Sequence, residues 1–201
     1  MATEGTTTRL GADERKLQLL VAALHTFGAN GFTATSMNDV AEAAGVTKPV
    51  VYQHFDSKHH LYLELLSQTR SRLVELLSAA VESAGGPREQ LERAFNAYFH
   101  FFADEPANFT VLYGEGVRSD PHFTEELRAV EDTFVSFTAE YIDIEGVERD
   151  DRLMYARAVA GLLEGAVRRW IQEGERRNPD ELSSMIFEFA WKGLRGVRAP
   201  D

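Results

Sequence analysis

Apolar side chains recur along most of the chain at the three- and four-residue spacing of an amphipathic α-helix. No stretch alternates apolar and polar residues over the length of a β-strand, so the pattern predicts an all-α fold of about nine helices. Glycine and proline interrupt the pattern and separate the helices. Beyond the N-terminal region, helices are predicted at about 58–83, 88–103, 106–113, 121–141, 152–173 and 179–197, with an acidic linker at 143–151.

The N-terminal region begins with a polar stretch, residues 1–11, that we expect to be disordered. A first helix is then predicted, with Asp13 as its cap and with Gly28 and Gly31 ending it. We expect one face of this helix to close the core of a three-helix unit, and that face carries Leu17, Leu20, Val21, Leu24 and Phe27.

Two short helices joined by a tight turn are predicted within residues 35–57. Ser36 and Asp39 have the spacing of a capping box at the start of the first helix, and Gly45 is expected to form the turn. Thr47 is placed to cap the second helix, and Pro49 suits its first turn, where a backbone N–H has no intrahelical partner. Helix, glycine turn and helix together indicate a helix-turn-helix, whose second helix lies in the DNA major groove.

The sequence AEAAGVT followed by VYQHFDSK resembles the DNA-binding domain of the TetR family of transcriptional regulators. The resemblance covers about residues 13–65. Lys48 and Pro49 depart from the commonest form, which has a glycine or another small residue there. The resemblance implies a helix-turn-helix domain at 12–57, a helical effector-binding and dimerisation domain at 58–201, and operator DNA as a partner.

The predicted DNA-contacting residues lie on or beside the second short helix. Gln53 and Lys48 have the donors and acceptors to address base edges, whereas Pro49 and Val50 can touch a thymine methyl group. Lys58 is expected to meet a phosphate, and the resemblance places His54 near one as well. The full predicted set is Thr35, Ser36, Thr47, Lys48, Pro49, Val50, Tyr52, Gln53, His54 and Lys58.

Aromatic residues are concentrated in the helices that follow. Aromatic side chains at helical spacing commonly form plain core. The resemblance adds a second interpretation, because TetR-like proteins enclose an apolar cavity for a small effector between these helices. The residues from which such a cavity would be lined are Phe95, Tyr98, Phe99, Phe102, Phe109, Tyr113, Phe134, Phe137 and Trp170.

The last two predicted helices are apolar on more than one side, which suits a buried position in a homodimer. Small residues allow close approach of helices, and the resemblance likewise implies dimerisation through the last two long helices. The predicted seam comprises Leu162, Gly165, Phe189, Ala190, Gly193 and Leu194, and Gly161 would also allow close approach.

The net charge of −11 is unequally distributed. Residues 1–60 hold five basic and six acidic side chains, whereas the remainder holds sixteen and twenty-six. Repulsion of DNA by the acidic remainder would favour specific over indiscriminate contact.

Other chemistry is weakly indicated. The chain lacks cysteine, which excludes disulfides and thiolate metal sites. His54, His59 and His60 lack the i, i+4 spacing of a helical metal site, so we predict neither a metal nor a cofactor. No carboxylate pair stands out as catalytic, and no apolar run is long enough to span a membrane. A start without a signal-peptide pattern favours the cytoplasm.

The sequence therefore predicts a non-enzymatic homodimeric regulator, a repressor released from a palindromic operator by an apolar or amphipathic small molecule. An all-α enzyme or ligand carrier that contains a similar helix-turn-helix segment is the alternative.

Overall fold

The computed structural model describes residues 11–82, 84–114, 116–117, 120–141 and 147–197. Regular structure in these ranges is helical, with no strand among them, so the predicted all-α class is confirmed. The predicted tail, apart from Gly11, and residues 143–146 of the predicted linker lie outside the described residues.

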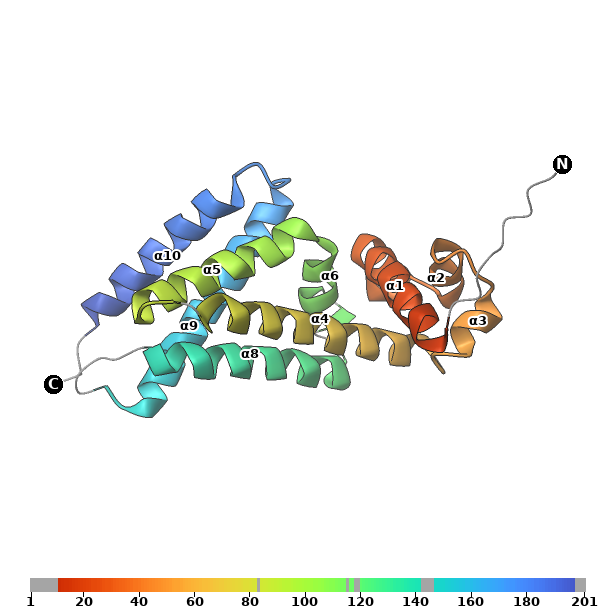
Figure 1. Ribbon diagram of the computed structural model, residues 1–201, viewed down its shortest axis with the longest axis horizontal. Coiled ribbons are helices and arrows are strands. Elements are labelled where there is room, and N and C mark those ends of the chain that lie inside the picture. The colour runs from red at the N-terminus through yellow and green to blue at the C-terminus, as the bar shows by residue number, and fades with distance from the viewer. Residues whose placement is uncertain (1–10, 83, 115, 118–119, 142–146, 198–201) are drawn as a thin grey trace.

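Three helices form a separate unit at one end of an elongated molecule, where Figure 1 shows them in red and orange. They are α1 (Ala12–Ala34), α2 (Met37–Ala43) and α3 (Lys48–Tyr52). Side chains from all three helices and from Phe55, three residues after α3, fill the core of this unit. Its other buried members include Leu20, Leu24, Phe27, Val40 and Val51.

Helix α1 differs from its prediction at both ends and on one face. It begins after Gly11 rather than at Asp13, and its path bends at Gly31, where a φ of 74° suits glycine alone. Gly28 does not end the helix. Leu17 and Val21 were expected in the core but are 53% and 57% exposed, because the buried face is centred on Leu20, Leu24 and Phe27.

The rest of the chain forms a helical body. Its helices are α4 (Lys58–Glu82), α5 (Pro87–Asp104), α6 (Ala107–Tyr113), α8 (Pro121–Tyr141), α9 (Arg149–Gln172) and α10 (Pro179–Gly196). Helix α4 runs from the three-helix unit along this body and packs against α5 and α8 (Figure 1). Helix α5 also packs against α10, and α8 packs against α9.

Side-chain caps define several of these helix starts. The Asn178 side chain accepts from the backbone N–H groups of Asp180 and Glu181, which confirms its predicted role at α10. Helix α9 begins three residues before its predicted start, so residues 149–151 are helix rather than linker. Asp150 and Asp151 then lie in its first turn, where the helix dipole favours negative charge.

An aromatic cluster joins the three-helix unit to the body. The ring of Tyr62 on α4 packs 4.8 Å from Phe27, 4.9 Å from Phe32 and 4.8 Å from Phe123, measured between ring centroids. Its hydroxyl donates to the Val111 carbonyl at 3.0 Å, and burial raises the pKa of Tyr62, so the donor stays protonated. One side chain thus connects α1, α4, α6 and α8.

A second contact brings α1 against α6 at short range. A Cβ atom added to Gly28 would lie only 2.4 Å from the Cβ of Ala107, so the two helices approach more closely than any larger side chain permits. Gly28 serves this approach instead of the predicted helix end.

Candidate DNA-binding surface and effector cavity

The turn between α2 and α3 has the expected local chemistry. The Ser36 hydroxyl accepts from the Asp39 N–H at 3.3 Å, and Asp39 accepts from the Ser36 N–H at 2.8 Å, which confirms the capping box. These hydrogen bonds to Ser36 lower the pKa of Asp39. Gly45 has a φ of 65°, as the tight turn requires, and Gln18 on α1 donates to the adjacent Ala44 carbonyl. The turn is therefore fixed to α1.

Helix α3 presents a polar face to solvent. Thr47, Lys48, Pro49, Tyr52 and Gln53 are exposed, whereas Val50 and His54 are half-buried. The opposite side is held by Val51 and Phe55, both fully buried. An open groove beside α3 is lined by Val46, Thr47, Val50, Gln53 and His54 together with Ala12 and Arg15 of α1. The structure thus brings most of the predicted DNA-contacting residues onto one accessible surface.

Arg15 lies in this groove, although sequence reasoning did not single it out. Its guanidinium donates to the Gln18 side chain at 2.6 Å, and Gln18 holds the turn before α3. This arrangement places a second cation, besides Lys48, beside the α3 surface. A basic residue near the start of the first helix is the signal that could have identified it.

Thr47 occupies the N-cap position of α3, but its hydroxyl makes no capping hydrogen bond. Thr47 thus has the predicted position, but the prediction that its side chain caps α3 is wrong. Pro49 is the second helical residue, in agreement with the prediction that it belongs in the first turn.

Two predicted DNA contacts, Thr35 and Lys58, are turned into the protein. Thr35 is 1% exposed, and its hydroxyl donates to the Gly31 carbonyl at 2.8 Å. The Lys58 ammonium donates to the carbonyls of residues 32, 33 and 35 at 2.8, 3.3 and 2.9 Å, and it lies 4.5 Å from the centroid of the Phe32 ring. Both side chains satisfy carbonyl groups at the end of α1. Their predicted contacts with DNA are corrected accordingly.

A cavity of about 180 Å³ lies in the body between α4, α5, α6, α8 and α9. Tyr98 and Tyr113 line it, with their hydroxyl oxygens 3.2 Å apart, and Phe134 closes another side. A smaller void of about 50 Å³ is bordered by Leu77 and Phe134 as well, so these two side chains contact both spaces. The arrangement can accommodate a small apolar group beside two tyrosine hydroxyls.

The predicted aromatic set divides between cavity and core. Phe137 borders the smaller void, and Tyr98, Tyr113 and Phe134 line the larger one. The other five aromatic residues line neither space and are buried in packing contacts of the core, and they are Phe95, Phe99, Phe102, Phe109 and Trp170.

Sequence reasoning missed the polar lining of the cavity. Asp132 on α8 and Arg157 on α9 face each other with a nitrogen–oxygen separation of 3.9 Å, and Glu164 lies about two helical turns beyond Arg157 along α9. These side chains stand among many other solvated charges of the same helices, so their spacing carries no distinguishing signal.

An uncovered apolar surface lies along α9 and α10. Phe189 is 70% exposed and Met185 is 49% exposed. Gly161, Gly165 and Gly193 are exposed, and an added Cβ would meet nothing within 4 Å at any of them. Of the other predicted seam residues, Leu162 and Leu194 are half-buried, whereas Ala190 is only 7% exposed because it faces the body; its assignment to the seam is corrected.

None of the described helices combines the length and apolar character needed to cross a membrane.

Two family models match this chain. Residues 19–65 match the model for bacterial regulatory proteins of the tetR family, and residues 87–193 match the model for a tetracyclin repressor-like C-terminal domain. The first match contains the helix-turn-helix, and the second contains the cavity lining other than Leu73 and Leu77 of α4, together with the uncovered surface of α9 and α10.

Similar proteins include both activators and repressors. The HTH-type transcriptional activator FasR of Mycolicibacterium smegmatis is 29% identical over 190 residues, which cover 94% of this chain and 87% of that protein. The HTH-type transcriptional repressor KstR2 of Mycobacterium tuberculosis is 31% identical over 114 residues, or 56% of this chain and 57% of that protein.

Solved structures show the same fold. A TetR-like transcriptional regulator from Rhodococcus sp. RHA1 superposes with a TM-score of 0.81 at 29% identity, covering 94% of this chain and all of the other. The regulator FadR of Bacillus subtilis, in complex with stearoyl-CoA, has a TM-score of 0.76 at 16% identity over 90% of this chain and 99% of its own. The second likeness concerns the fold alone.

The three carbonyl contacts of Lys58 generate a stability prediction. Lys58→Met keeps the length of the side chain and removes its charged donor, so it should lower the free energy of unfolding by about 1.5–3 kcal/mol. Lys48→Met on the exposed face of α3 is the matched control and should change it by less than about 0.5 kcal/mol. Urea unfolding followed by circular dichroism measures both. Equal effects of the two substitutions would contradict the inward role of Lys58.

Proposed function

The chain belongs to the TetR family of bacterial regulatory proteins and is a helix-turn-helix transcriptional regulator. On this basis we propose that it is a homodimeric repressor. In this proposal it binds a palindromic operator through α3, and an apolar or amphipathic small molecule releases it. The family is regulatory and DNA-binding, so the alternative of an all-α enzyme or carrier is not favoured. We propose no catalytic activity and a cytoplasmic location.

The observation that carries the proposal is the exposed face of α3. A five-residue helix is held from behind by two buried side chains, Val51 and Phe55, and presents Lys48, Tyr52 and Gln53 outward. We propose that this face enters the major groove, with Gln53 and Lys48 at base edges. Tyr52 then lies against the backbone, where its hydroxyl donates to a phosphate.

Half-buried His54 and Arg15 border the same groove and suit the phosphates beside the bases that α3 reads. The exposed hydroxyls of Ser36 and Thr47 complete the proposed contact surface, with Pro49 and Val50 against thymine methyl groups. The buried Thr35 and the inward Lys58 are left out, and they support the surface from within.

Dimerisation is proposed through α9 and α10. Phe189 and Met185 expose a large apolar area, and the glycines at 161, 165 and 193 leave space for a second helix to approach. A two-fold axis at this surface gives each dimer two α3 helices and therefore a palindromic operator.

The effector is proposed to enter the cavity beside α4. A volume of about 180 Å³ is below the roughly 300 Å³ at which ligand pockets commonly begin, so binding must displace side chains. Phe134 and Leu77 stand between the cavity and the smaller void, and their movement would join the two spaces. Tyr98 and Tyr113 provide hydroxyls for a polar end of the ligand.

Helix α4 provides the mechanical link to DNA. Leu73 and Leu77 face the cavity, while Lys58 and Tyr62 at the start of the same helix bind the carbonyls and the aromatic residues of α1. A ligand that shifts α4 therefore changes the position of the three-helix unit and the separation of the two α3 helices in a dimer. The ligand can release the protein from DNA only if it binds the DNA-incompetent conformation of the dimer more tightly than the DNA-binding one.

Base recognition by α3 predicts a selective loss of DNA affinity. Gln53→Ala should weaken binding to the preferred operator by about 1–3 kcal/mol and relax the preference at one base position. Gln172→Ala, an exposed glutamine at the end of α9, is the control and should leave the binding curve unchanged. The operator is first obtained by in vitro selection, and fluorescence anisotropy at fixed salt gives the affinities. A Gln53→Ala protein with unaltered affinity and preference would exclude this docking of α3.

The proposed dimer surface predicts the mass in solution. The wild-type protein should have twice the 22.5 kDa chain mass by light scattering at micromolar concentration, and Phe189→Glu should shift it towards 22.5 kDa by placing a charge in the apolar seam. Val21→Glu, at a comparably exposed apolar residue on α1, should remain dimeric. A monomeric wild-type protein, or dissociation by both substitutions alike, would refute the seam.

The link through α4 predicts reciprocal coupling. A ligand identified by native mass spectrometry of the purified protein should weaken operator binding by about 1–3 kcal/mol, and operator DNA should weaken the ligand by the same factor. Leu73→Trp, which fills the cavity, should impair release while leaving ligand-free operator binding intact; Leu76→Trp on the exposed side of α4 is the control. Ligand titration with and without operator decides, since equal affinities would show that the cavity does not control DNA binding.

A further inference from the structure

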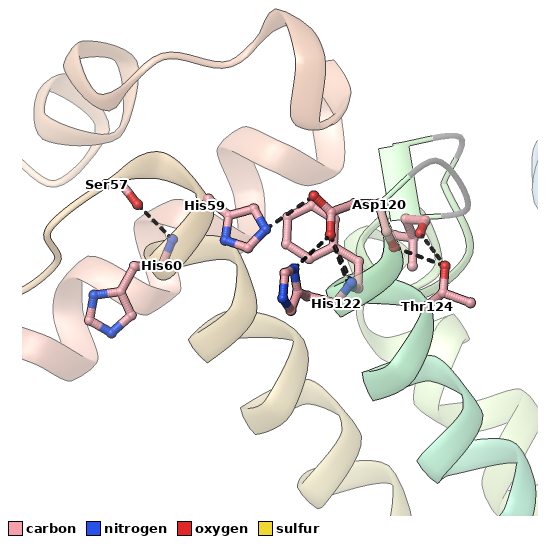
Figure 2. A network of polar contacts seen from close by, with 8 residues as sticks. Ser57, His59, His60, Asp120, His122 and Thr124 are labelled. Carbon is pink, nitrogen blue, oxygen red and sulfur yellow. Dashed lines mark hydrogen bonds and ion pairs between the residues drawn. The ribbon is translucent and has the colours of Figure 1, made fainter.

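Three side chains with metal-binding atoms converge where α4 and α8 begin, as Figure 2 shows. His59 lies in the first turn of α4, Asp120 immediately precedes α8, and His122 is its second residue. His59 Nε2 is 3.1 Å from Asp120 Oδ2, and His122 Nδ1 is 3.6 Å from Asp120 Oδ1. One donor atom from each residue lies within 4.8 Å of the other two.

The two oxygen atoms of Asp120 have separate tasks. Oδ1 accepts from the N–H groups of His122 at 2.9 Å and Phe123 at 3.4 Å and so caps α8, whereas Oδ2 faces His59. The carboxylate therefore has one oxygen engaged by the backbone of α8 and the other facing the imidazole of His59.

Neighbouring residues fix the orientation of His59. Its ring stacks on Phe123, with centroids 4.6 Å apart and planes inclined by 22°. Phe123 is fully buried in the aromatic cluster around Tyr62. His122 is the most exposed of the three, with 71% of its side chain accessible, so it can rotate towards the other two.

Two imidazoles and one carboxylate are the ligand types of borderline divalent cations such as Zn²⁺, whereas Mg²⁺ and Ca²⁺ favour sets made of oxygen atoms alone. We propose that His59, Asp120 and His122 bind one zinc-class divalent cation, which ties the start of α4 to the start of α8. Bond lengths of about 2.0–2.2 Å require the donors to approach one another slightly, which rotation of His122 supplies. Water completes the coordination.

The site joins two segments that are far apart in sequence. His59 and Asp120 are separated by 61 residues, and the third ligand comes from the same turn as the second. His60, which was grouped with His59 by sequence, instead faces Glu64 and Asp56 and points away from the other three side chains (Figure 2). His60 is consequently a natural control for unspecific binding by surface histidines.

The test uses the full-length protein without an affinity tag, dialysed against chelator. Titration with Co²⁺, followed by visible absorption, and with Zn²⁺, followed by calorimetry, should show one ion per chain with a dissociation constant in the micromolar range. His59→Gln and His122→Gln should each weaken binding at least tenfold. His60→Gln should bind as the wild type does.

A thermal-unfolding measurement provides a second readout. Zn²⁺ should raise the melting temperature of the wild type and of His60→Gln, because binding to the folded state alone stabilises it. It should have no such effect on His122→Gln. His122 is 71% exposed, so the substitution should leave the fold intact, and circular dichroism checks this directly. Wild-type binding only at millimolar metal, or equal losses in His60→Gln and His59→Gln, would overturn the proposal whatever the outcome of the DNA-binding experiments.

Discussion

The joint between the end of α1 and the start of α4 is the constraint on which the rest of the structure depends. Helix ends leave carbonyl groups without intrahelical partners, and the Lys58 ammonium satisfies three of them at residues 32, 33 and 35. Helix α4 also contributes Tyr62 to the buried aromatic cluster, where its ring contacts Phe27 and Phe123. A cation at the surface and a phenol in the core therefore hold the orientation of the three-helix unit, and the placement of α3 follows from it.

Local signals made the helix-turn-helix predictable from the sequence. Ser36 and Asp39, three residues apart, form the capping box at the start of α2, and the turn after α2 requires only the positive φ of Gly45. Neither feature depends on contacts with distant parts of the chain. The direction in which Thr35 and Lys58 point is a different matter. Both are polar residues at the border of a surface, and only the path of α1 after Gly31 brings carbonyl groups within their reach. A motif specifies residue types, but not the side to which they turn.

The body was predictable in its helices and less so in their contacts. Periodicity identifies an apolar face, and on α5 the aromatic residues of that face, Phe95, Tyr98, Phe99 and Phe102, are all buried. Periodicity does not show where packed helices leave a cavity between them. Tyr98, which lines the cavity, and Phe99, which is packed in the core, therefore look alike in the sequence. Ala190 was misassigned for the same reason. The convergence of His59 with Asp120 likewise arises only when α4 and α8 lie side by side.

The close approach of α1 and α6 at Gly28 and Ala107 has a geometric consequence for motion. Two backbones already in contact at this point leave no distance over which the three-helix unit could slide inward, whereas tilting about the point requires no closer approach. The contact can then act as a pivot, with the cavity of the body on one side and α3 on the other. A tilt of the three-helix unit about this pivot would move α3 in proportion to the distance between α3 and the contact.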